Sequence, residues 1–498
     1  MSERTGQKRG NMDRQNLTLL TDLYELTMMQ GYFKNKDRNE TVIFDAFYRN
    51  NPCGGGYAIS AGLEQVIQYI KELHFDEEDI DYLASLGIFE ADFLDYLRNF
   101  KFSGDVYAIL EGTVMFPREP IVKVIAPIME AQLVETAILN IINHQSLIAT
   151  KAARVCYAAK GDGIMEFGLR RAQGPDAGTY GARAAVIGGC NGTSNVLAGQ
   201  LFDIPVKGTH AHSWIMSFPD EYTAFKTYAD MYPNACILLV DTYDTLKSGV
   251  PNAIRVFTEM REAGIPLTFY GIRLDSGDLA YLSKKARKML DAAGFPDAVI
   301  SASNDLDEYL IDSLKAQGAT ITSWGVGTNL ITSKDNPSFG GVYKLAAVRG
   351  ADGNFIPKIK LSENTEKITN PGNKMIYRIY EKDEKGADKI KADLICLVDE
   401  QYDADSDLLL FDPLEPWKKT KLAGGTYTLR PIMKQIFKNG ECCYTSPKVM
   451  EIRDYCQQEL DTLWEETKRL VNPHQVYVDL SKKLYDIKIQ LLDQMSEK

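Results

Sequence analysis

Hydrophobic and polar positions follow three successive patterns along the chain. In the first, the stretch LTLLTDLYELTMM near the N-terminus repeats leucines at helical spacing. Residues 41–48 (TVIFDAFY), rich in β-branched and aromatic side chains, predict a strand that runs into a glycine-rich loop. Short strands separated by Gly and Pro are expected over 105–125, and one long helical stretch over 128–159. This part mixes helices with strands and shows no regular alternation.

In the second pattern, short strand candidates alternate regularly with amphipathic helices. The strands are expected at 164–167, 204–207, 236–241, 267–272, 298–302 and 322–326. Such alternation is typical of crossover βα units and therefore of a parallel sheet. With six or more units, the sequence favours a closed barrel over an open sheet.

The third pattern begins after Gly340, where the alternation stops. VYKLAAV, FIPKIKL, MIYRIY and DLICLV predict strands of a smaller, largely antiparallel domain, and a helical tail starts at Lys448. These strands could pair with those of 105–125, which would build one domain from two separated segments. We therefore expect the N-terminal part of a small domain at 1–150, a barrel at 151–340, and the strands and tail that complete the small domain at 341–498.

Composition narrows the class of protein. The 498 residues are 45% hydrophobic and 25% charged, and 56 Lys plus Arg against 68 Asp plus Glu give a net charge of −12. This balance argues against general binding to nucleic acid or to an anionic membrane, although it leaves room for a local anion site. The polar N-terminus has no apolar signal-peptide core, and no apolar run approaches 18 residues. We expect a cytoplasmic protein with no membrane partner.

The eight cysteines include no C-x-x-C pair, which is typical of free thiols in a reducing compartment. The adjacent Cys442 and Cys443 leave a structural metal open, but no second pair matches them.

Polar clusters follow nearly every expected strand of the second pattern. They are GLRRAQGPDAGTYGAR, GGCNGTSN, GTHAHSW, DTYDT, RLDSGDL, SASND and GVGTN. Ligands of barrels and of open α/β sheets bind at the carboxyl ends of the strands. Seven clusters, each at a strand end, predict one ligand site.

Two of these clusters suit a phosphate. GGCNGTSN, and GVGTN with Gly325 and Gly327, place unhindered backbone N–H groups just before helices. Leu330 stands where a dinucleotide fingerprint needs its third glycine, and no P-loop motif occurs. Either cluster alone fits a plain βα turn. Phosphate binding is favoured because nearby strand ends carry Arg170, Arg171, Arg183, Lys207 and Arg273.

RLDSGDL is the most distinctive cluster. Arg273 offers a planar fork for a carboxylate or phosphate. Asp275 and Asp278 could accept hydrogen bonds from ribose hydroxyls or position a hydrated Mg²⁺. Ser276 or Asp278 could instead cap the following helix, whereas Arg273 and Asp275 share a face of an extended stretch.

THAHS holds His210 and His212, two of only five histidines. They share a face if the segment is extended, as in a metal-dependent hydrolase. Such a site needs further histidines, and only His474 follows, so this alternative is minor. For His210, a buried hydrogen-bonded histidine is as good an interpretation as a functional one.

With RLDSGDL, THAHS and EFGLRRAQGP in this order, the sequence resembles the nicotinate phosphoribosyltransferases. TDLYELTM, FDAFYRNNPCGGGYAISAGLEQ, GVGTN and GGVYKL extend the resemblance over most of 16–345. The resemblance implies an irregular α/β barrel of the type II phosphoribosyltransferase kind, with a smaller α+β domain formed from N-terminal and C-terminal segments. It also implies a homodimer whose active sites take residues from both subunits.

The resemblance further implies an activity. Members make nicotinate mononucleotide and pyrophosphate from nicotinate and phosphoribosyl pyrophosphate with Mg²⁺, in the salvage route to NAD. ATP is a co-substrate, and its hydrolysis is coupled through a transiently phosphorylated histidine, so the enzymes are classed as ligases. That histidine matches His212.

Site residues are implied in the same way. Thr209 matches a nicotinate-contacting position, and Phe167 and Arg170 match a ring-stacking aromatic and a ligand-binding arginine. Tyr24 matches the tyrosine that reaches the pyridine ring, in the partner subunit's site. From the residues alone, Phe167 also fits a core position and Tyr24 fits helix packing.

The remaining matched positions concern the carboxylate and the phosphate. Arg273 matches the arginine near the nicotinate carboxylate, and Thr328 matches a position that contacts the ribose phosphate. Related nicotinamide-using enzymes have an acid where this chain has Ser194, and an acid there would repel nicotinate. We therefore expect nicotinate as the substrate. A relative that binds phosphoribosyl pyrophosphate without turnover is the other alternative, although no key motif position is degraded.

Overall fold

The computed structural model describes residues 16–35, 39–362, 367–415 and 417–496. The chain divides into two compact units. The first unit comprises residues up to 147, 338–447 and 454–498; the second unit comprises 148–337 and 448–453. The sequence placed the boundaries at 150 and 340, whereas the units divide after 147 and after 337, and a short piece of the C-terminal tail joins the second unit.

The first unit contains a seven-stranded sheet in which every neighbouring pair is antiparallel. Its order is β13 (Phe355–Pro357), β12 (Gly341–Arg349), β1 (Thr41–Tyr48), β5 (Val122–Pro127), β3 (Asp105–Ile109), β19 (Met433–Lys438) and β20 (Glu441–Cys442). Two contacts join distant segments of the chain. β12 pairs with β1, and β19 pairs with β3 of the expected 105–125 strands. N-terminal and C-terminal segments therefore form one sheet.

A second sheet of the first unit has six strands. Its order is β17 (Lys419–Leu422), β16 (Leu408–Phe411), β21 (Tyr477–Leu480), β15 (Asp388–Leu397), β14 (Lys374–Lys382) and β18 (Thr428–Pro431). Only β15 and β21 pair in parallel among these neighbours. MIYRIY and DLICLV thus pair with each other and not with the strands of 105–125. A short pair, β2 (Ala58–Ile59) and β4 (Val114–Met115), completes the unit's strands.

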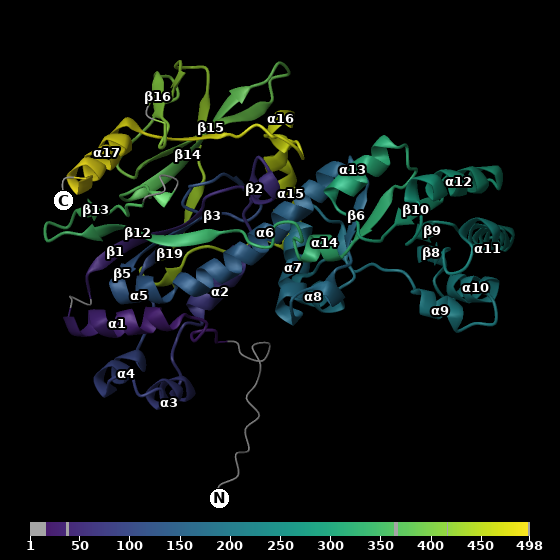
Figure 1. Ribbon diagram of the computed structural model, residues 1–498, viewed down its shortest axis with the longest axis horizontal. Helices are drawn as coiled ribbons and strands as arrows, with labels where there is room; N and C mark the ends of the chain where they lie inside the picture. Colours follow the sequence, from purple (N-terminus) through teal and green to yellow (C-terminus); the bar gives the residue numbers. More distant parts are fainter. Residues whose placement is uncertain (1–15, 36–38, 363–366, 416, 497–498) are drawn as a thin grey trace, which may run out of the picture. The chain divides into compact units, whose positions relative to one another are not determined.

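Helices pack against the seven-stranded sheet through one large cluster of buried apolar side chains (Figure 1). The helices of the first unit are α1 (Leu23–Asn35), α2 (Leu63–Lys71), α3 (Glu77–Ser85), α4 (Ala91–Leu97), α5 (Ile128–Leu133), α16 (Glu465–Lys468) and α17 (Lys482–Ser496). Two more, α6 (Glu135–Ala159) and α15 (Val449–Asp461), run through both units' segments.

The single helix expected over 128–159 is wrong, because the chain breaks after α5 at Val134. The buried carboxylate of Glu25 explains the new start. It accepts from the Thr136 N–H (3.0 Å) and from the Thr136 hydroxyl (2.6 Å), so it satisfies the free N-terminus of α6.

The second unit contains a six-stranded parallel sheet. Its order is β7 (Gly192–Thr193), β6 (Gly163–Glu166), β11 (Ser323–Val326), β10 (Val299–Ala302), β9 (Tyr270–Leu274) and β8 (Cys236–Leu239). Its helices are α7 (Pro175–Ile187), α8 (Val196–Phe202), α9 (His212–Met216), α10 (Glu221–Met231), α11 (Val250–Glu262), α12 (Leu279–Ala292), α13 (Glu308–Ala316) and α14 (Thr328–Ile331). The predicted alternation of strand and helix is confirmed.

The sheet is a curled half-barrel, and the closed barrel is not confirmed. Within the described residues, β7 and β8 are the ends of the hydrogen-bonded order. The strand expected at 204–207 is reduced to an isolated bridge between Thr193 and Val206. Pro205 has no N–H to give to a ladder, which limits this segment to one bridge beyond β7.

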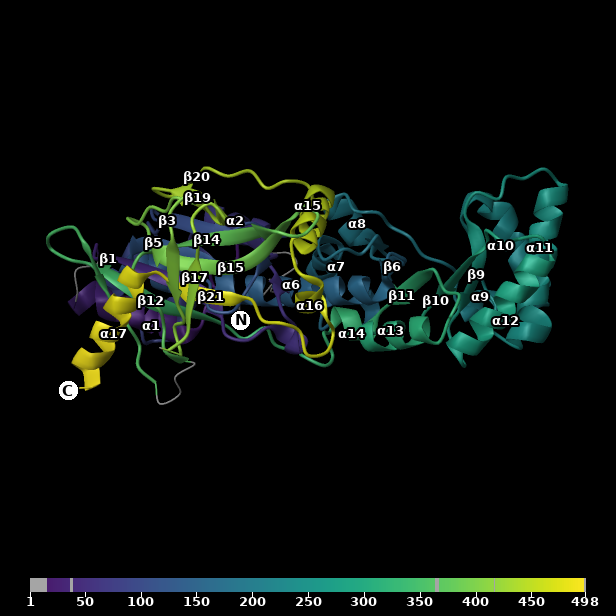
Figure 2. The ribbon, with the colours of Figure 1, turned by 90° about the horizontal axis from the view of Figure 1, so that it is seen from above.

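Helices cover the strands of the parallel sheet, and the strand direction places the polar clusters at one edge. α10, α11 and α12 pack on β8, β9 and β10 (Figure 1 and Figure 2). The strands are parallel, so their carboxyl ends all meet at one edge, where the polar clusters follow. In the part of the chain that the structure describes, no helix is long and apolar enough to span a bilayer.

A buried ion cluster links the second sheet of the first unit to α15. The Arg378 guanidinium lies 2.7 Å from Asp393 Oδ2 and 3.2 Å from Glu459 Oε2, and the side chains of Arg378 and Asp393 are fully buried. Burial and the neighbouring Asp393 hold the pKa of the Glu119 carboxyl well above its usual range. Arg378 therefore compensates the charge of Asp393, whereas Glu459 also pairs with Arg430 at 2.6 Å.

We predict that Arg378→Met destabilises the first unit by about 3–5 kcal/mol, because it leaves the carboxylate of Asp393 buried without its cation. The matched control is Lys382→Met in the same strand, whose exposed pair with Asp388 should contribute less than about 1 kcal/mol. Urea unfolding followed by intrinsic fluorescence measures both. Equal effects of the two changes would contradict the prediction.

Candidate active site

His212 lies where the strand-end clusters of β8 and β9 meet. Its Nδ1 is 3.0 Å from the Thr242 hydroxyl, and its Nε2 lies 3.9 Å from Asp241 Oδ1 and 3.7 Å from Asp275 Oδ2. The side chain is 39% exposed, so a ligand can reach it. The structure thus places the predicted His212 between two carboxylates and one hydroxyl.

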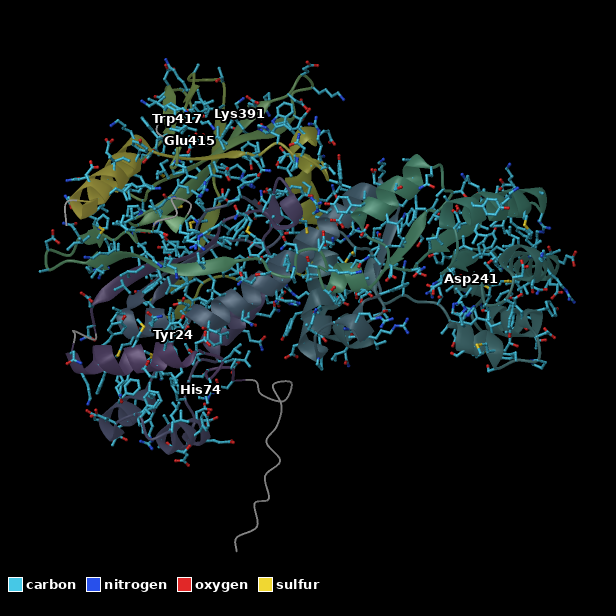
Figure 3. All side chains as sticks on the ribbon, viewed as in Figure 1. Tyr24, His74, Asp241, Lys391, Glu415 and Trp417 are labelled. Carbon is cyan, nitrogen blue, oxygen red and sulfur yellow. The ribbon has the colours of Figure 1, made fainter. Side chains whose placement is uncertain are left out.

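Asp241, two residues after the end of β8 and labelled in Figure 3, is a site residue that the sequence did not identify. Its side chain is only 1% exposed. Oδ2 accepts from the Asp275 N–H and the Ser276 hydroxyl, both at 2.7 Å. Oδ1 is buried and has no hydrogen-bond partner among the described residues. The available signal was the DTYDT cluster at a strand end.

Arg273 and Asp275 form the centre of the site. The Arg273 Nη2 donates to Asp275 Oδ1 at 2.9 Å, Nη1 donates to Thr209 Oγ1 at 2.8 Å, and Nε donates to Ser303 Oγ at 2.9 Å. The Ser303 hydroxyl also donates to Asp275. Burial opposes ionisation of Asp275, but Ser303 and the Arg273 charge outweigh it and hold the pKa of this carboxyl below its usual range. Asp275 is therefore an anion.

His210 has a packing role rather than a ligand role. Its Nε2 accepts from the Leu239 N–H at 3.3 Å, and its ring packs against Phe225 and Tyr228. Burial lowers the pKa of His210 to about 4, so the ring is neutral. It therefore does not join His212 at a shared ligand, which removes the geometric basis of a His-x-His metal hydrolase.

A cavity of about 270 Å³ lies on one face of the parallel sheet. Phe167, which follows β6, lines it at the carboxyl edge of the sheet together with Thr209, whereas Phe269 and Thr322, which precede β9 and β11, line it at the amino edge. Aromatic and apolar walls with a few polar groups are typical of a site for a small planar ligand. Phe167 and Thr209 both belong to the predicted substrate residues, so the structure brings them together.

The predicted ring-binding residues occupy the turns after β6 and β7. The Phe167 ring centroid is 5.9 Å from the Arg273 guanidinium carbon, and Arg170 is exposed in the turn Leu169–Arg171. Ser194 is half-buried, and its N–H donates to the Glu166 carbonyl at 3.0 Å. The Glu166 side chain is fully buried beneath both turns.

The two glycines of the GVGTN cluster lie in close contact with Phe167. A Cβ on Gly325 would lie 2.5 Å from Phe167 Cδ2, and one on Gly327 would lie 3.2 Å from the Phe167 carbonyl oxygen. Both glycines therefore allow Phe167 to pack closely. Phosphate binding by Gly325 and Gly327, and a ribose-phosphate contact by the half-buried Thr328, stay predictions.

The structure also places three other residues to which the sequence assigned possible roles. Asp278 caps α12 by accepting from the Tyr281 N–H at 2.9 Å, so the cap interpretation is confirmed. Arg183 is fully buried, with its guanidinium carbon 5.8 Å from the Phe202 ring centroid, so it is not exposed to a phosphate. Tyr24 lies on α1 in the first unit and is 45% exposed (Figure 3).

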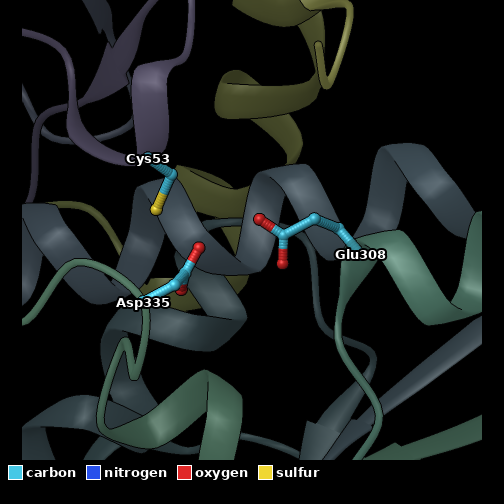
Figure 4. A group of neighbouring side chains, drawn as sticks. All are labelled: Cys53, Glu308 and Asp335. Carbon is cyan, nitrogen blue, oxygen red and sulfur yellow. The ribbon is translucent and has the colours of Figure 1, made fainter.

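Two other carboxylates of the second unit, Glu308 and Asp335 (Figure 4), belong to structural ion pairs. Lys151 lies 2.7 Å from Glu308 Oε2 and 2.6 Å from Asp335 Oδ1, and Arg154 lies 2.9 Å from Glu308 Oε1. Lys151 and Arg154 therefore compensate their charge, and we assign them no part in the site.

We predict that His210 makes folding sensitive to acid. Its folded pKa is below its unfolded value, so its contribution to stability is complete above about pH 6.5 and falls toward pH 4. The loss is on the order of 3 kcal/mol at most. His210→Gln, which keeps an acceptor for Leu239, should flatten this slope in urea unfolding at several pH values. An unchanged slope would contradict the assignment, and His74→Gln at an exposed histidine is the control.

Comparison with known proteins assigns almost the whole chain. The model of the nicotinate phosphoribosyltransferase (NAPRTase) N-terminal domain matches residues 19–143, that of the NAPRTase family matches 163–369, and that of the C-terminal domain matches 373–488. The crystal structure of human nicotinic acid phosphoribosyltransferase is similar, with a TM-score of 0.79 and 29% identity, over 95% of this chain and 100% of that one.

Two further similarities separate fold from family. Nicotinate-nucleotide pyrophosphorylase from Pyrococcus furiosus shares the fold, with a TM-score of 0.68 and 22% identity over 93% of this chain and 99% of that one. Nicotinate phosphoribosyltransferase of Bacillus subtilis (strain 168) is 47% identical over 483 residues, which cover 97% of this chain and 96% of the relative. From these matches together, the chain belongs to the nicotinate phosphoribosyltransferase family.

Proposed function

We propose that the protein transfers the phosphoribosyl group of phosphoribosyl pyrophosphate to nicotinate, forming nicotinate mononucleotide and pyrophosphate for NAD salvage, with coupled ATP hydrolysis. One observation carries this proposal. His212, Asp241, Asp275 and Arg273 form a single network at the carboxyl edge of the parallel sheet, in a chain that belongs to this family. The network offers anionic, cationic and imidazole groups to one ligand.

The transfer itself needs no nucleophilic side chain. When pyrophosphate leaves, the ribose carbon gains oxocarbenium character, and the nicotinate ring nitrogen attacks it. The protein then contributes orientation and electrostatic stabilisation. The anionic Asp275 beside His212 is suited to stabilise positive charge on the ribose or to accept from its hydroxyls.

Nicotinate binding is assigned to the cavity beside Phe167. A guanidinium has five N–H donors, and three of those of Arg273 go to Ser303, Thr209 and Asp275, so two remain for the nicotinate carboxylate. The Phe167 ring next to this guanidinium offers a stacking surface. Ser194 adds no negative charge near the ligand.

His212 is the residue that we propose to be phosphorylated by ATP. The half-exposed imidazole is accessible, and its two nitrogens face different partners, Thr242 on one side and carboxylates on the other. Carboxylates can hold an imidazole in one orientation and stabilise its charged form. Phosphorylation would add negative charge at this edge, order the phosphate-binding loops and favour product formation.

Mg²⁺ fits the same edge of the sheet. Asp241 Oδ1 is buried and has no hydrogen-bond partner in the described part of the chain, and Asp275 Oδ2 lies beside His212, so two carboxylate oxygens are available as ligands. When bound there, the ion would neutralise negative charge on the pyrophosphate group. Asp241 and Asp275 are the residues that we propose to hold it, in place of the Asp275 and Asp278 pair suggested by the sequence.

We also propose a cytoplasmic homodimer with active sites shared between subunits. The exposure of Tyr24 on α1 is compatible with a contact to a pyridine ring bound by a second copy. Sedimentation velocity of the protein alone tests the dimer, and a Tyr24→Ala change that left the KM for nicotinate unaltered would contradict the contact.

The direct test mixes the protein, nicotinate, phosphoribosyl pyrophosphate and Mg²⁺, with and without ATP, and measures nicotinate mononucleotide. We expect product in both cases and more with ATP. We predict that His212→Ala removes the stimulation by ATP, while the control His74→Ala, at an exposed histidine of the first unit, keeps it. Full stimulation in His212→Ala would overturn the histidine's role, and binding without any product would favour the non-catalytic alternative.

Selectivity gives a separate prediction. Ser194→Asp should lower kcat/KM for nicotinate on the order of 100-fold, because like charges brought close together cost several kcal/mol. The same change should raise the relative use of nicotinamide, whose amide can donate to the new carboxylate. Ser194→Asn is the neutral control of similar size. If Ser194→Asn had the same effect as Ser194→Asp, charge would not be the cause.

A further inference from the structure

Glu166, the last residue of β6, has a fully buried carboxylate whose hydrogen-bond partners are all neutral. Oε1 accepts from the Gly168 N–H, and Oε2 accepts from the Thr193 hydroxyl at 2.6 Å. Within the described ranges, no lysine, arginine or histidine forms an ion pair with it. Burying a carboxylate without a cation costs free energy, and hydrogen bonds from two neutral donors offset only part of that cost. Fold stability alone therefore does not explain why an acid stands at this position.

The two partners of this carboxylate belong to different ligand-binding turns. Gly168 lies in the turn that carries Phe167 and Arg170, and Thr193 directly precedes Ser194. The backbone carbonyl of Glu166 accepts from the Ser194 N–H as well, at 3.0 Å. One residue thus connects the ring-stacking turn to the turn that carries the selectivity position.

The connection continues on the Thr193 side. The Thr193 hydroxyl donates to Glu166 and accepts from the Asn195 N–H at 2.9 Å. The Asn195 side chain donates to the Gly178 carbonyl at 3.2 Å and accepts from the Ala198 N–H at 3.1 Å, which caps α8. The Thr193 hydroxyl has one proton, which it donates to Glu166. The chain of hydrogen bonds therefore requires a hydrogen-bond acceptor at the position of the Glu166 carboxylate.

On the Gly168 side, the backbone is packed closely against neighbouring side chains. A Cβ on Gly168 would lie 2.6 Å from Ile331 Cγ2 and 2.8 Å from Glu166 Oε1. The Phe167 ring is held just as closely, because a Cβ on Gly325 would lie 2.5 Å from it. A shift of the Gly168 turn would therefore be transmitted to Phe167.

We propose that Glu166 is a positioning residue for the pyridine ring: its carboxylate fixes the spacing between the Phe167 turn and the Ser194 turn. This inference rests on the proposed function, because it takes Phe167 and Ser194 as the ring-binding residues. Glu166 itself is buried beneath the turns and touches no substrate. Its loss should weaken the binding of nicotinate and relax its discrimination from nicotinamide, and it should leave the binding of phosphoribosyl pyrophosphate unchanged.

The test uses Glu166→Gln in the full-length protein. The amide offers only one acceptor oxygen, so either the Gly168 N–H or the Thr193 hydroxyl is left without an acceptor. We expect the KM for nicotinate to rise about 10-fold. The KM for phosphoribosyl pyrophosphate should change less than about 2-fold, and the preference for nicotinate over nicotinamide should fall.

The matched control is Glu221→Gln in α10. Glu221 is also a buried carboxylate, and it also accepts from a hydroxyl and an amide, those of Ser248 and Asn252. Neither partner belongs to the candidate site. Both donors reach Oε2, which an amide oxygen can replace, so Glu221→Gln removes a buried charge without breaking these hydrogen bonds, and both KM values should stay unchanged. An equal rise of the KM for nicotinate in this control would reduce Glu166 to a purely structural role.

Thr193→Val keeps the proposal testable if Glu166→Gln folds poorly. This change deletes the hydroxyl and keeps the side-chain volume, and it should raise the KM for nicotinate in the same direction. In a double-mutant cycle the two changes should be less than additive, because both break one hydrogen bond. Additive effects, or equal rises of both KM values, would overturn the inference.

Wild-type protein in the same assay separates this inference from the proposed function. If the wild-type protein makes no product, the proposed function fails. If it is active and Glu166→Gln has unchanged kinetics, only this inference fails.

Discussion

The ion pair between Arg273 and Asp275 is the interaction on which the arrangement of the candidate site depends. Each partner is partly buried, and each forms further hydrogen bonds with residues from other strand ends: both bind Ser303 after β10, and Arg273 also binds Thr209 in the segment before α9. Asp241 then holds the backbone of Asp275 in place. Each of these charged side chains is stabilised by its hydrogen-bonded neighbours. The network therefore connects the ends of β8, β9 and β10 before any ligand binds.

Such preorganisation has a functional meaning for phosphoribosyl transfer. A reaction that passes through a cationic ribose gains most from charges that are already oriented, because no reorganisation is then needed at the transition state. His212 lies at the rim of this network and is more exposed than Asp241, Arg273 and Asp275, with its ring between a hydroxyl and two carboxylates. A rigid base with one accessible imidazole suits the phosphorylation that we propose for His212.

The sequence predicted most of the second unit because its signals are local. The residues 236–241 and 298–302 gave β8 and β10 within two residues, and RLDSGDL and THAHS supplied His212, Arg273 and Asp275. Asp241 was missed because its role comes from the neighbour relation of β8 and β9, which fixes its contact with the Asp275 backbone. Closure of the sheet could not be predicted either, since it depends on twist and on how far the segment at Pro205 can pair.

The first unit was less predictable because its order is set by pairing across the chain. Short apolar segments predict that strands exist, but not which partner each one takes. β12 joins β1, whereas β14 and β15 leave this sheet and form another. Likewise, the break of the expected helix over 128–159 depends on Glu25, more than a hundred residues earlier in the chain.

The pairing of β1 with β12 also constrains how the protein is synthesised. β1, β3 and β5 leave the ribosome early, but β1 and β3 receive their outer neighbours, β12 and β19, only after the main segment of the second unit, residues 148–337, has been translated. During that interval both strands present open, apolar edges, which are prone to pair with other chains. The second unit has a contiguous main segment and can fold while the first is still incomplete. Expression yield should therefore respond strongly to temperature and to chaperones, independently of how stable the finished protein is.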